Sequence, residues 1–379
     1  MVDSVVRLGV VGLGNIGRQH IKNIQQFVSG CELSAICARK RVDIPGAENA
    51  QFFSDYQAMI DSGVIDAVLI ATPTMAHLTQ GLYALQRGLH VLMEKPIGLS
   101  IQEGEQLLDA SGSHVFALML NQRADPLFLT MKARLPALGE IQRTHWTMTN
   151  WFRPEVYFQV SDWRATWKGE GGGMLVNQCI HNLDIFQWIC GMPSELRGFC
   201  EFGKYHSIEV EDEASAFFRY KNGASGVFIG STGEAPGVNR FDIIGNRGTL
   251  SFDGERLMLK QNSESSAAYC RNTRDMFGMP ECVVTDITPE RNVNQHVVII
   301  QNFINAIRSK EKLIAPAREG LNSLALANAI LLSAWDGMDV FFPLDSARFQ
   351  AALEQRIAHS VLRNKVDIVA NIDMDKSYR

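Results

Sequence analysis

A glycine-rich turn near the N-terminus has the spacing needed to hold a phosphate group. The segment GLGNIG, residues 12–17, follows a strand pattern at 5–11 and precedes a helical pattern. In that context the first glycine permits a tight bend, the second lets the backbone approach a pyrophosphate, and the third allows close packing of helix on strand. The helix N-terminus then offers unpaired N–H groups and a positive dipole end to the anion. We therefore predict a dinucleotide site, rather than a turn that merely needs small residues, at Gly12, Gly14, Asn15, Ile16 and Gly17.

The residues after the second expected strand, at 33–37, bear on which dinucleotide binds. An Asp or Glu there would accept hydrogen bonds from the ribose 2′-hydroxyl of NAD. The sequence instead has Ala38, Arg39, Lys40 and Arg41, and its three cations suit the 2′-phosphate of NADP. These residues favour NADP over NAD. The alternatives are NAD itself and a basic turn that is simply solvated.

A parallel sheet with helices on both faces is needed to position such a site. Strand patterns alternate with helical patterns along the first 120 or so residues, which is typical of βα units. We expect strands at 5–11, 33–37, 67–71, 90–93 and 114–120, and helices at 15–28, 56–62, 75–87 and 101–110. The pattern predicts an α/β Rossmann domain with a doubly wound parallel sheet over residues 1–121.

The pattern changes after Asn121. Segments rich in Thr, Val and aromatic residues are separated by tight-turn sequences such as Lys221-Asn222-Gly223. We expect strands at 142–151, 195–203, 213–220, 224–230, 239–244 and 249–252, helices at 173–189, 294–308 and 321–335, and a long mobile loop at 261–281. Residues 122–379 are therefore predicted to form an α+β domain with a large, open, mostly antiparallel sheet. The helices are too few to cover both faces, so we expect a homodimer or homotetramer formed through this sheet.

Three further segments carry a resemblance to a known family. They are the segment IATPT at residues 70–74 with His77 soon after, the Glu94-Lys95-Pro96 motif after the strand at 90–93, and a triple glycine at 171–173. With Asn177 and His181 after the triple glycine, the chain resembles the glucose-fructose oxidoreductase / inositol dehydrogenase / MocA (Gfo/Idh/MocA) family over most of its length. The resemblance implies a nicotinamide-dependent oxidoreductase that acts on a sugar, a sugar derivative, a polyol or an inositol.

The resemblance also implies catalytic residues. Lys95 matches the lysine that is catalytic in the family, and His181 matches the catalytic histidine. An imidazole is suited to proton transfer near neutrality, and an ammonium at the end of a strand can stabilise charge on the reacting oxygen. Asn177 stands where the family more commonly has Asp, and an amide can orient a hydroxyl but cannot take its proton. Asn177 and His181 are four residues apart in an expected helix and should share one face.

Other residues are candidates for the cofactor site. By family position His77 lies near the nicotinamide, or it has a structural role, while Thr72 and Pro73 shape the cofactor crevice. Glu94 and Lys95 are also counted with the cofactor site, and the alternative for Lys95 is that it simply pairs with Glu94 or another carboxylate.

Candidate substrate contacts come from an aromatic segment and from the domain junction. Trp163, Arg164 and Trp167 precede the glycine run, and aromatic rings stack on sugar faces while Arg binds hydroxyls or carboxylates. Packing or an interface is the alternative for these residues. Arg123 is a further candidate, and Asp184 either orients the imidazole of His181 or faces solvent.

Composition excludes several classes of protein. With 46% hydrophobic and 20% charged residues the chain is globular, and a net charge of −5 argues against nucleic acid as a partner. The longest apolar runs, at 67–71 and 115–120, are far shorter than the roughly 20 residues of a membrane-spanning helix, so no membrane partner is expected. Seven cysteines without a C-x-x-C pair suggest reduced thiols in the cytoplasm, and no metal site is expected.

Two other functions remain open from the sequence. One is a regulator that binds a dinucleotide without catalysis, against which the retained Lys95 and His181 count. The other is a glycoside-cleaving enzyme that oxidises its sugar transiently with bound NAD, because that half-reaction would need the same residues.

Overall fold

The computed structural model describes residues 5–41, 43–309 and 311–363. The chain forms two compact units. Among the described residues, the first comprises 5–124 together with 168–171 and 293–325, and the second comprises 125–167, 172–292 and 326–363. The sequence predicts one crossing, at residue 121. The chain instead crosses between the units several times, because two later segments return to the first unit.

The first unit contains a six-stranded sheet in the order β3-β2-β1-β4-β5-β6, in which every pair is parallel. This order is that of a doubly wound dinucleotide-binding fold, as expected. All four residues of β4 are buried, because helices cover both faces of a parallel sheet. The strands are β1 (Val6–Val11), β2 (Cys31–Cys37), β3 (Gln51–Phe53), β4 (Ala67–Ile70), β5 (His90–Met93) and β6 (Phe116–Leu118).

The helices of the first unit agree closely with the sequence patterns. The predicted helix at 75–87 begins as a 3-10 turn, η1 (Thr74–Ala76). The α-helices are α1 (Asn15–Phe27), α2 (Tyr56–Asp61), α3 (His77–Gln86), α4 (Ile101–Ser111) and, from the later return of the chain, α11 (Gln295–Ser309). The 3-10 helix η2 (Asn121–Ala124) ends the first segment of this unit.

The second unit contains a nine-stranded sheet in the order β14-β13-β12-β11-β7-β10-β9-β8-β15. Among the described residues of this sheet, β7 and β10 form the only parallel pair, and the other pairs are antiparallel. The strands are β7 (Ile141–Met148), β8 (Glu195–Phe202), β9 (Glu211–Arg219), β10 (Ser225–Ser231), β11 (Asn239–Gly245), β12 (Gly248–Phe252), β13 (Leu257–Asn262), β14 (Cys282–Asp286) and β15 (Val340–Phe341). The expected large, mostly antiparallel sheet is confirmed.

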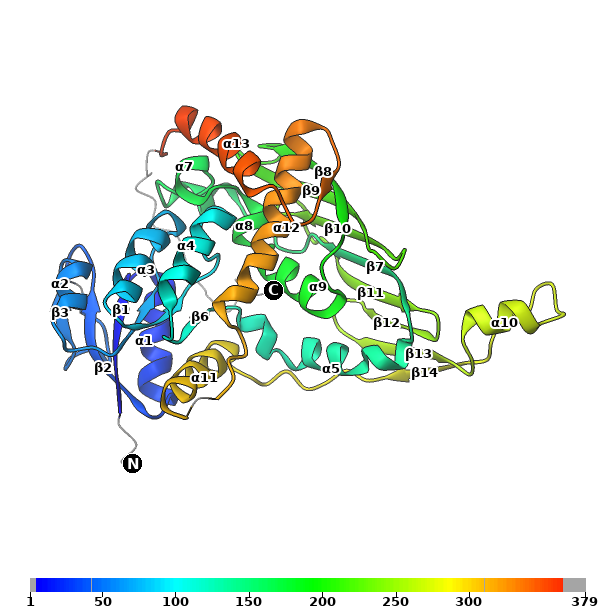
Figure 1. Ribbon diagram of the computed structural model, residues 1–379, viewed down its shortest axis with the longest axis horizontal. Helices are drawn as coiled ribbons and strands as arrows, with labels where there is room; N and C mark the ends of the chain where they lie inside the picture. The colour runs from blue at the N-terminus through cyan, green and yellow to red at the C-terminus, as the bar shows by residue number, and fades with distance from the viewer. Residues whose placement is uncertain (1–4, 42, 310, 364–379) are drawn as a thin grey trace. The chain divides into compact units, whose positions relative to one another are not determined.

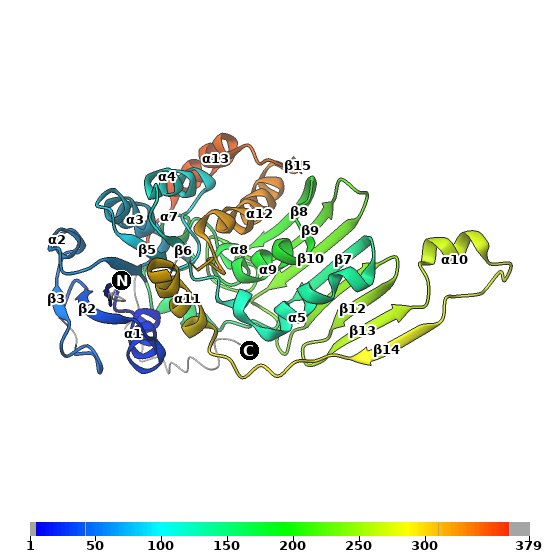
Figure 2. The same ribbon diagram turned by 60° about the horizontal axis from the view of Figure 1, so that its bottom comes forward.

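Helices cover one face of this sheet (Figure 2). They include α5 (Pro126–Arg134), α8 (Met174–Asn177), α9 (Ile180–Cys190) and the C-terminal part of α12 (Ala317–Asp336). Under them Trp146 stacks on Phe241 with ring centroids 4.3 Å apart, and Phe186 of α9 packs on the same ring at 5.9 Å. The opposite face carries no helix among the described residues of this unit (Figure 1). The core of the second unit therefore lies on one side of its sheet.

The structure differs from the sequence expectation over residues 261–281. Instead of one long loop, β13 continues to Asn262 and α10 (Ser266–Asn272) follows it, before β14 pairs back on β13. Figure 1 shows α10 at the far end of this hairpin. All five residues of β14 are exposed, so the strand has no buried face and leaves no alternating apolar pattern in the sequence. Helices α5, α6 (Glu155–Gln159), α7 (Trp167–Glu170) and α13 (Ser346–His359) were also not anticipated.

Candidate functional site

The glycine turn has the geometry of an open anion site. Gly12 has φ +97°, and a side chain there would lie 2.5 Å from the carbonyl oxygen of Ala71. A side chain at Gly17 would lie 1.9 Å from the oxygen of Gly12. At Gly14, by contrast, a Cβ would meet no atom of the described residues within 4 Å, and none of their side chains caps the N-terminus of α1. The fold itself needs Gly12 and Gly17, whereas the space above Gly14 and the N–H groups of Asn15 and its neighbours are available to a ligand.

The end of β2 lies beside this turn. The N–H of Gly12 donates to the carbonyl of Cys37 at 3.0 Å, which places Ala38 next to the glycines. Arg39 and Lys40 follow and are exposed, while the guanidinium of Arg41 sits 5.9 Å from the ring centroid of Phe52. The cations expected to meet a 2′-phosphate are therefore near the turn.

The loops after β4 and β5 are tied together by His77. Its Nδ1 lies 2.8 Å from the carbonyl oxygen of Pro96, and its Nε2 lies 2.9 Å from that of Thr72. The side chain is 1% exposed, and burial lowers the pKa of His77. Both ring nitrogens are directed at backbone carbonyls, so the residue fixes the course of the chain beside Pro73 and Pro96. The hydroxyl of Thr72 donates to Gln80 at 2.7 Å.

Glu94 and Lys95 follow β5 at the same edge of the sheet. Glu94 is buried, and one carboxylate oxygen lies 2.7 Å from Nε2 of His20 while the other accepts the backbone N–H of Lys95 at 3.3 Å. Burial alone would raise the pKa of Glu94. The hydrogen bond from His20, followed by electrostatic interactions with His20, Lys95 and His296, lowers it instead to about 2. The sequence patterns did not mark His20 or His296, although His20 lies on the buried face of α1 with Gly17 and Ile24.

The segment that carries Asn177 and His181 is not the single straight helix expected over 173–189. Helix α8 ends at Asn177 and α9 begins at Ile180. Between them the N–H of Cys179 donates to the oxygen of Met174, five residues back, at 2.8 Å. One extra residue in a turn rotates the next helical residues by about 100° relative to a straight helix. Asn177 and His181 therefore do not share a face as i and i+4 of one α-helix.

A buried carboxylate holds the start of this segment. Glu211, on β9, is 0% exposed and accepts the N–H groups of Gly173 and Leu175 at 2.9 Å each. These are donors at the N-terminus of α8 that have no partner within the helix. No periodic signal in the sequence marks Glu211, because its strand was expected to begin only at residue 213. Glu211 therefore fixes the helix that presents Asn177.

The other polar and aromatic candidates have defined surroundings. Asp184 is 1% exposed and accepts a hydrogen bond from Gln187 at 3.0 Å, so it does not face solvent. Arg123 is fully buried, forms an ion pair with Glu319 and donates to the oxygen of Ile314 at 3.4 Å. Arg123 is therefore held within the first unit by these contacts.

The aromatic segment of the second unit divides into two parts. Trp167 is buried, and its ring meets that of Trp335 edge-on at 5.5 Å, which is a packing contact. The guanidinium of Arg164 instead lies 4.6 Å from the ring centroid of Tyr157 and 4.9 Å from that of Trp163. Trp163 and Arg164 thus lie against each other, whereas Trp167 has a packing role.

Neither a metal cluster nor a membrane-spanning helix is found in the described part of the chain. Across 5–41, 43–309 and 311–363, no three His, Cys, Asp or Glu side chains are grouped so that they could hold a metal ion. Over the same residues, no helix is long and apolar enough to cross a membrane.

Comparison with known proteins gave matches along most of the chain. Residues 6–121 match the model of an oxidoreductase family with an NAD-binding Rossmann fold. The D-glucoside 3-dehydrogenase of Escherichia coli is 24% identical, with 90% of this chain and 98% of that protein covered. The myo-inositol 2-dehydrogenase of Thermotoga maritima is 26% identical, with 86% and 95% covered.

Solved structures agree with this result. The WlbA dehydrogenase from Bordetella pertussis, in complex with NADH and UDP-GlcNAcA, is 27% identical with a TM-score of 0.75 over 90% of this chain and 99% of that one. A levoglucosan dehydrogenase in complex with NADH and L-sorbose, 18% identical with a TM-score of 0.73 over 89% and 99%, shares the fold. Residues 128–251 match the Gfo/Idh/MocA C-terminal domain. With both domain models matched in order, this chain belongs to the Gfo/Idh/MocA family of oxidoreductases.

Proposed function

We propose that this protein is an NADP-dependent dehydrogenase or reductase that transfers hydride between the nicotinamide and a secondary alcohol or ketone of a sugar, a sugar derivative or an inositol. The proposal rests on what lies at the edge of the parallel sheet where its strands have their carboxyl ends. There the open glycine turn after β1 and the Glu94–Lys95 segment after β5 follow the carboxyl ends of strands of one sheet. Ligands of such sheets bind at this edge. Because no described residue covers Gly14 or caps the start of α1, these residues fit a dinucleotide.

The residues of the chain would divide the proton chemistry between them. When bound, the nicotinamide would accept or supply the hydride. In the oxidising direction His181 would take the hydroxyl proton, and in the reducing direction it would return a proton to the oxygen. The ammonium of Lys95 would hold the reacting oxygen and stabilise negative charge on it, while the amide of Asn177 would orient the hydroxyl.

The substrate class is proposed from the relatives: two are named for a glucoside and for myo-inositol, and a third was solved in complex with UDP-GlcNAcA. The test is a screen of nicotinamide absorbance with inositols, free sugars, glycosides and nucleotide sugars, each with NAD and with NADP. We expect turnover with at least one of these hydroxylated rings. Absence of any absorbance change, with cofactor shown to bind, would contradict the proposal and favour a non-catalytic regulator. The same relatives are named as dehydrogenases, so neither that role nor transient-redox glycoside cleavage is favoured.

The preference for NADP rests on Arg39 and Lys40 and leads to a prediction. Replacing Arg39 by Asp should raise the Kd for NADPH roughly 10- to 100-fold, because it removes a charge-assisted contact to the 2′-phosphate. The Kd for NADH should change much less. Lys22→Asp, at an exposed position of α1, has the same change of charge and serves as the control. Calorimetric titration with both cofactors measures the effect, and an unchanged NADPH Kd in Arg39→Asp would overturn the preference.

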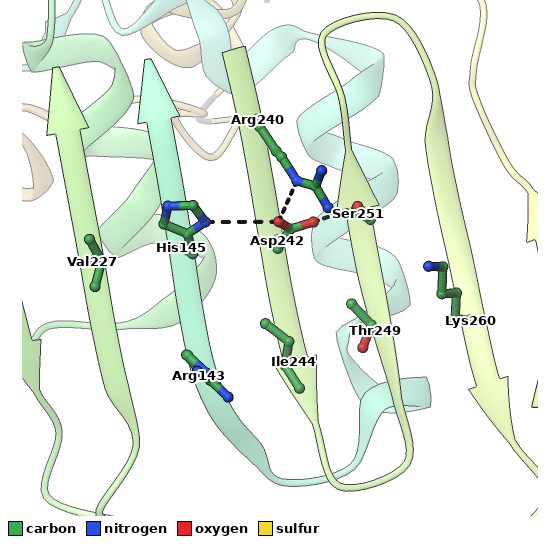
Figure 3. A pocket seen from close by; sticks show the side chains of 9 residues that line it. All are labelled: Arg143, His145, Val227, Arg240, Asp242, Ile244, Thr249, Ser251 and Lys260. Atoms are coloured by element: carbon green, nitrogen blue, oxygen red, sulfur yellow. Dashed lines mark hydrogen bonds and ion pairs between the residues drawn. The ribbon is translucent and has the colours of Figure 1, made fainter. Parts of the chain in front are cut away.

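We also propose a homodimer or homotetramer that forms through the open face of the nine-stranded sheet. Figure 3 shows a pocket on this face where Asp242 accepts a hydrogen bond from Arg240 at 2.8 Å and lies 3.9 Å from His145. Neighbouring strands β8 and β9 expose Phe199 (61%) and Phe217 (42%). Exposed aromatic side chains on a sheet face favour burial against a second copy.

Light scattering tests the assembly. The wild-type chain should give the mass of two or four copies, and Phe217→Asp should give a lower mass. The control is Phe27→Asp, at an exposed position of α1 in the other unit. A monomeric wild type at micromolar concentration would contradict the proposal.

Because the seven cysteines are free, a reducing compartment such as the cytoplasm is the proposed location.

A further inference from the structure

A histidine on the dinucleotide-binding helix lies behind the proposed catalytic lysine. His20 is three residues after Gly17 on α1, and its side chain is fully buried. Its Nε2 lies 2.7 Å from Glu94, whose other oxygen accepts the backbone N–H of Lys95 at 3.3 Å. One short chain of hydrogen bonds thus connects the helix of the glycine turn to the backbone of Lys95.

The chemistry of the pair fixes the position of one hydrogen. A carboxylate can only accept, so Nε2 of His20 must carry the hydrogen that it donates to Glu94. Nδ1 of His20 is buried and has no hydrogen-bond partner in the described chain. Four groups bear on the charge of Glu94: His20 from α1, Lys95 next in sequence, His296 from α11 and, more distantly, His77 from α3.

His296 adds no positive charge to this cluster near pH 7. Its ring lies 5.5 Å from that of His20, with an angle of 56° between the rings. Burial, with a contribution from His20, lowers the pKa of His296 to about 4, so the imidazole is neutral near pH 7. The start of α11 is held in place by bonds from Asn294 to Asn23 at 3.2 Å and from Asn121 to Gln295 at 2.9 Å.

We propose that His20 is a positioning residue for Lys95: its hydrogen bond keeps Glu94 ionised, and ionised Glu94 anchors the backbone of Lys95 and places a fixed negative charge beside its ammonium. This proposal rests on the role of Lys95 proposed above. His20 itself touches neither substrate nor cofactor in this account. The helix that would hold the pyrophosphate therefore also fixes the backbone position of Lys95 and the negative charge beside its ammonium.

Removing the hydrogen bond should change the pH dependence in a defined direction. Without His20, burial is the largest influence left on Glu94, and burial raises the pKa of a carboxyl group. In the wild type the pKa of Glu94 lies below its ordinary value, so its contribution to stability is present above about pH 4.5 and is lost as the pH falls towards 2. In a variant with a raised pKa, the buried carboxylate instead becomes a cost as the pH rises.

The test compares thermal unfolding of the full chain between about pH 4 and about pH 7 for the wild type, His20→Leu, His20→Gln and Glu94→Gln. His20→Leu should show its largest loss of Tm near neutrality and about half of that loss near pH 4. His20→Gln keeps a neutral N–H donor of similar reach and should restore most of the Tm. In a Glu94→Gln background the effect of His20→Leu should no longer depend on pH.

A second readout is the pH profile of kcat with the substrate that the absorbance screen identifies. For His20→Leu, kcat should fall as the pH is lowered through the raised pKa of Glu94, while the wild type and His20→Gln show no fall from this group. A loss of Tm that is equal at every pH, together with an unshifted kcat profile, would show that His20 only fills space and would overturn the proposal. The Lys95→Ala variant distinguishes failure of the proposed function from failure of this inference. Full turnover in Lys95→Ala refutes the proposed function itself. An inactive Lys95→Ala, together with a His20→Leu variant whose Tm and kcat depend on pH as in the wild type, refutes only the role of His20.

Discussion

Replacing Lys95 by alanine is expected to lower kcat by roughly 10²- to 10⁴-fold, the range typical for removal of a group that assists proton transfer and charge stabilisation. Lys95 is half-buried directly after β5, and its backbone is held by Glu94. Its backbone therefore lies at the edge of the sheet where ligands of such sheets bind. Because the glycine turn is untouched, cofactor affinity should change by less than about threefold, which calorimetric titration measures.

The matched control for this variant is Lys22→Ala, which removes an exposed lysine from the same unit. It should keep both turnover and cofactor affinity. Turnover of Lys95→Ala at the wild-type rate would contradict the proposed mechanism. A parallel loss of cofactor affinity would mean that Lys95 serves binding rather than the chemical step.

Replacing Glu211 by leucine is expected to lower the free energy of unfolding by about 4 kcal/mol. The carboxylate is fully buried and accepts N–H groups of Gly173 and Leu175. Leucine would leave these donors buried without an acceptor, and each unsatisfied group costs roughly 1–3 kcal/mol. The start of α8 would be loosened, so turnover should also fall through displacement of Asn177.

Glu213→Leu is the control on the same strand. Glu213 is only partly buried and pairs with Lys204 at 2.8 Å and with the hydroxyl of Tyr205 at 2.7 Å. Partly exposed pairs of this type contribute about 0–1 kcal/mol. Denaturant unfolding followed by circular dichroism measures both variants. Equal losses in Glu211→Leu and Glu213→Leu would show that Glu211 has no special part in holding α8.

The fold was predictable where burial leaves a periodic pattern. The range expected for β5, residues 90–93, is the range observed, and β4 was found because all its residues are apolar and buried. The exposed strand β14 was missed because neither of its faces is buried. The expected straight helix over 173–189 was wrong because the interruption at Cys179 arises from a backbone hydrogen bond that no residue type announces.

Residues of the candidate site were predictable where they belong to a sequence motif. The glycine turn, Lys95 and His181 all lie in segments that a motif marks. Glu211 and His20 act through contacts that span 36 and 74 residues of sequence, and such pairings exist only in the folded chain. The motif residues carry the proposed chemistry, and these distant partners determine how the motif residues are held.

The central claim, hydride transfer between a ring carbon and the nicotinamide, is tested most directly by isotope transfer. The substrate that the screen identifies would be prepared with deuterium on the carbon that is oxidised and incubated with wild-type protein and oxidised cofactor. Mass spectrometry of the recovered cofactor should show one deuterium per reduced nicotinamide, and Lys95→Ala should form this labelled cofactor roughly 10²- to 10⁴-fold more slowly. Reduced cofactor without deuterium, or an oxidised product without reduced cofactor, would contradict the account.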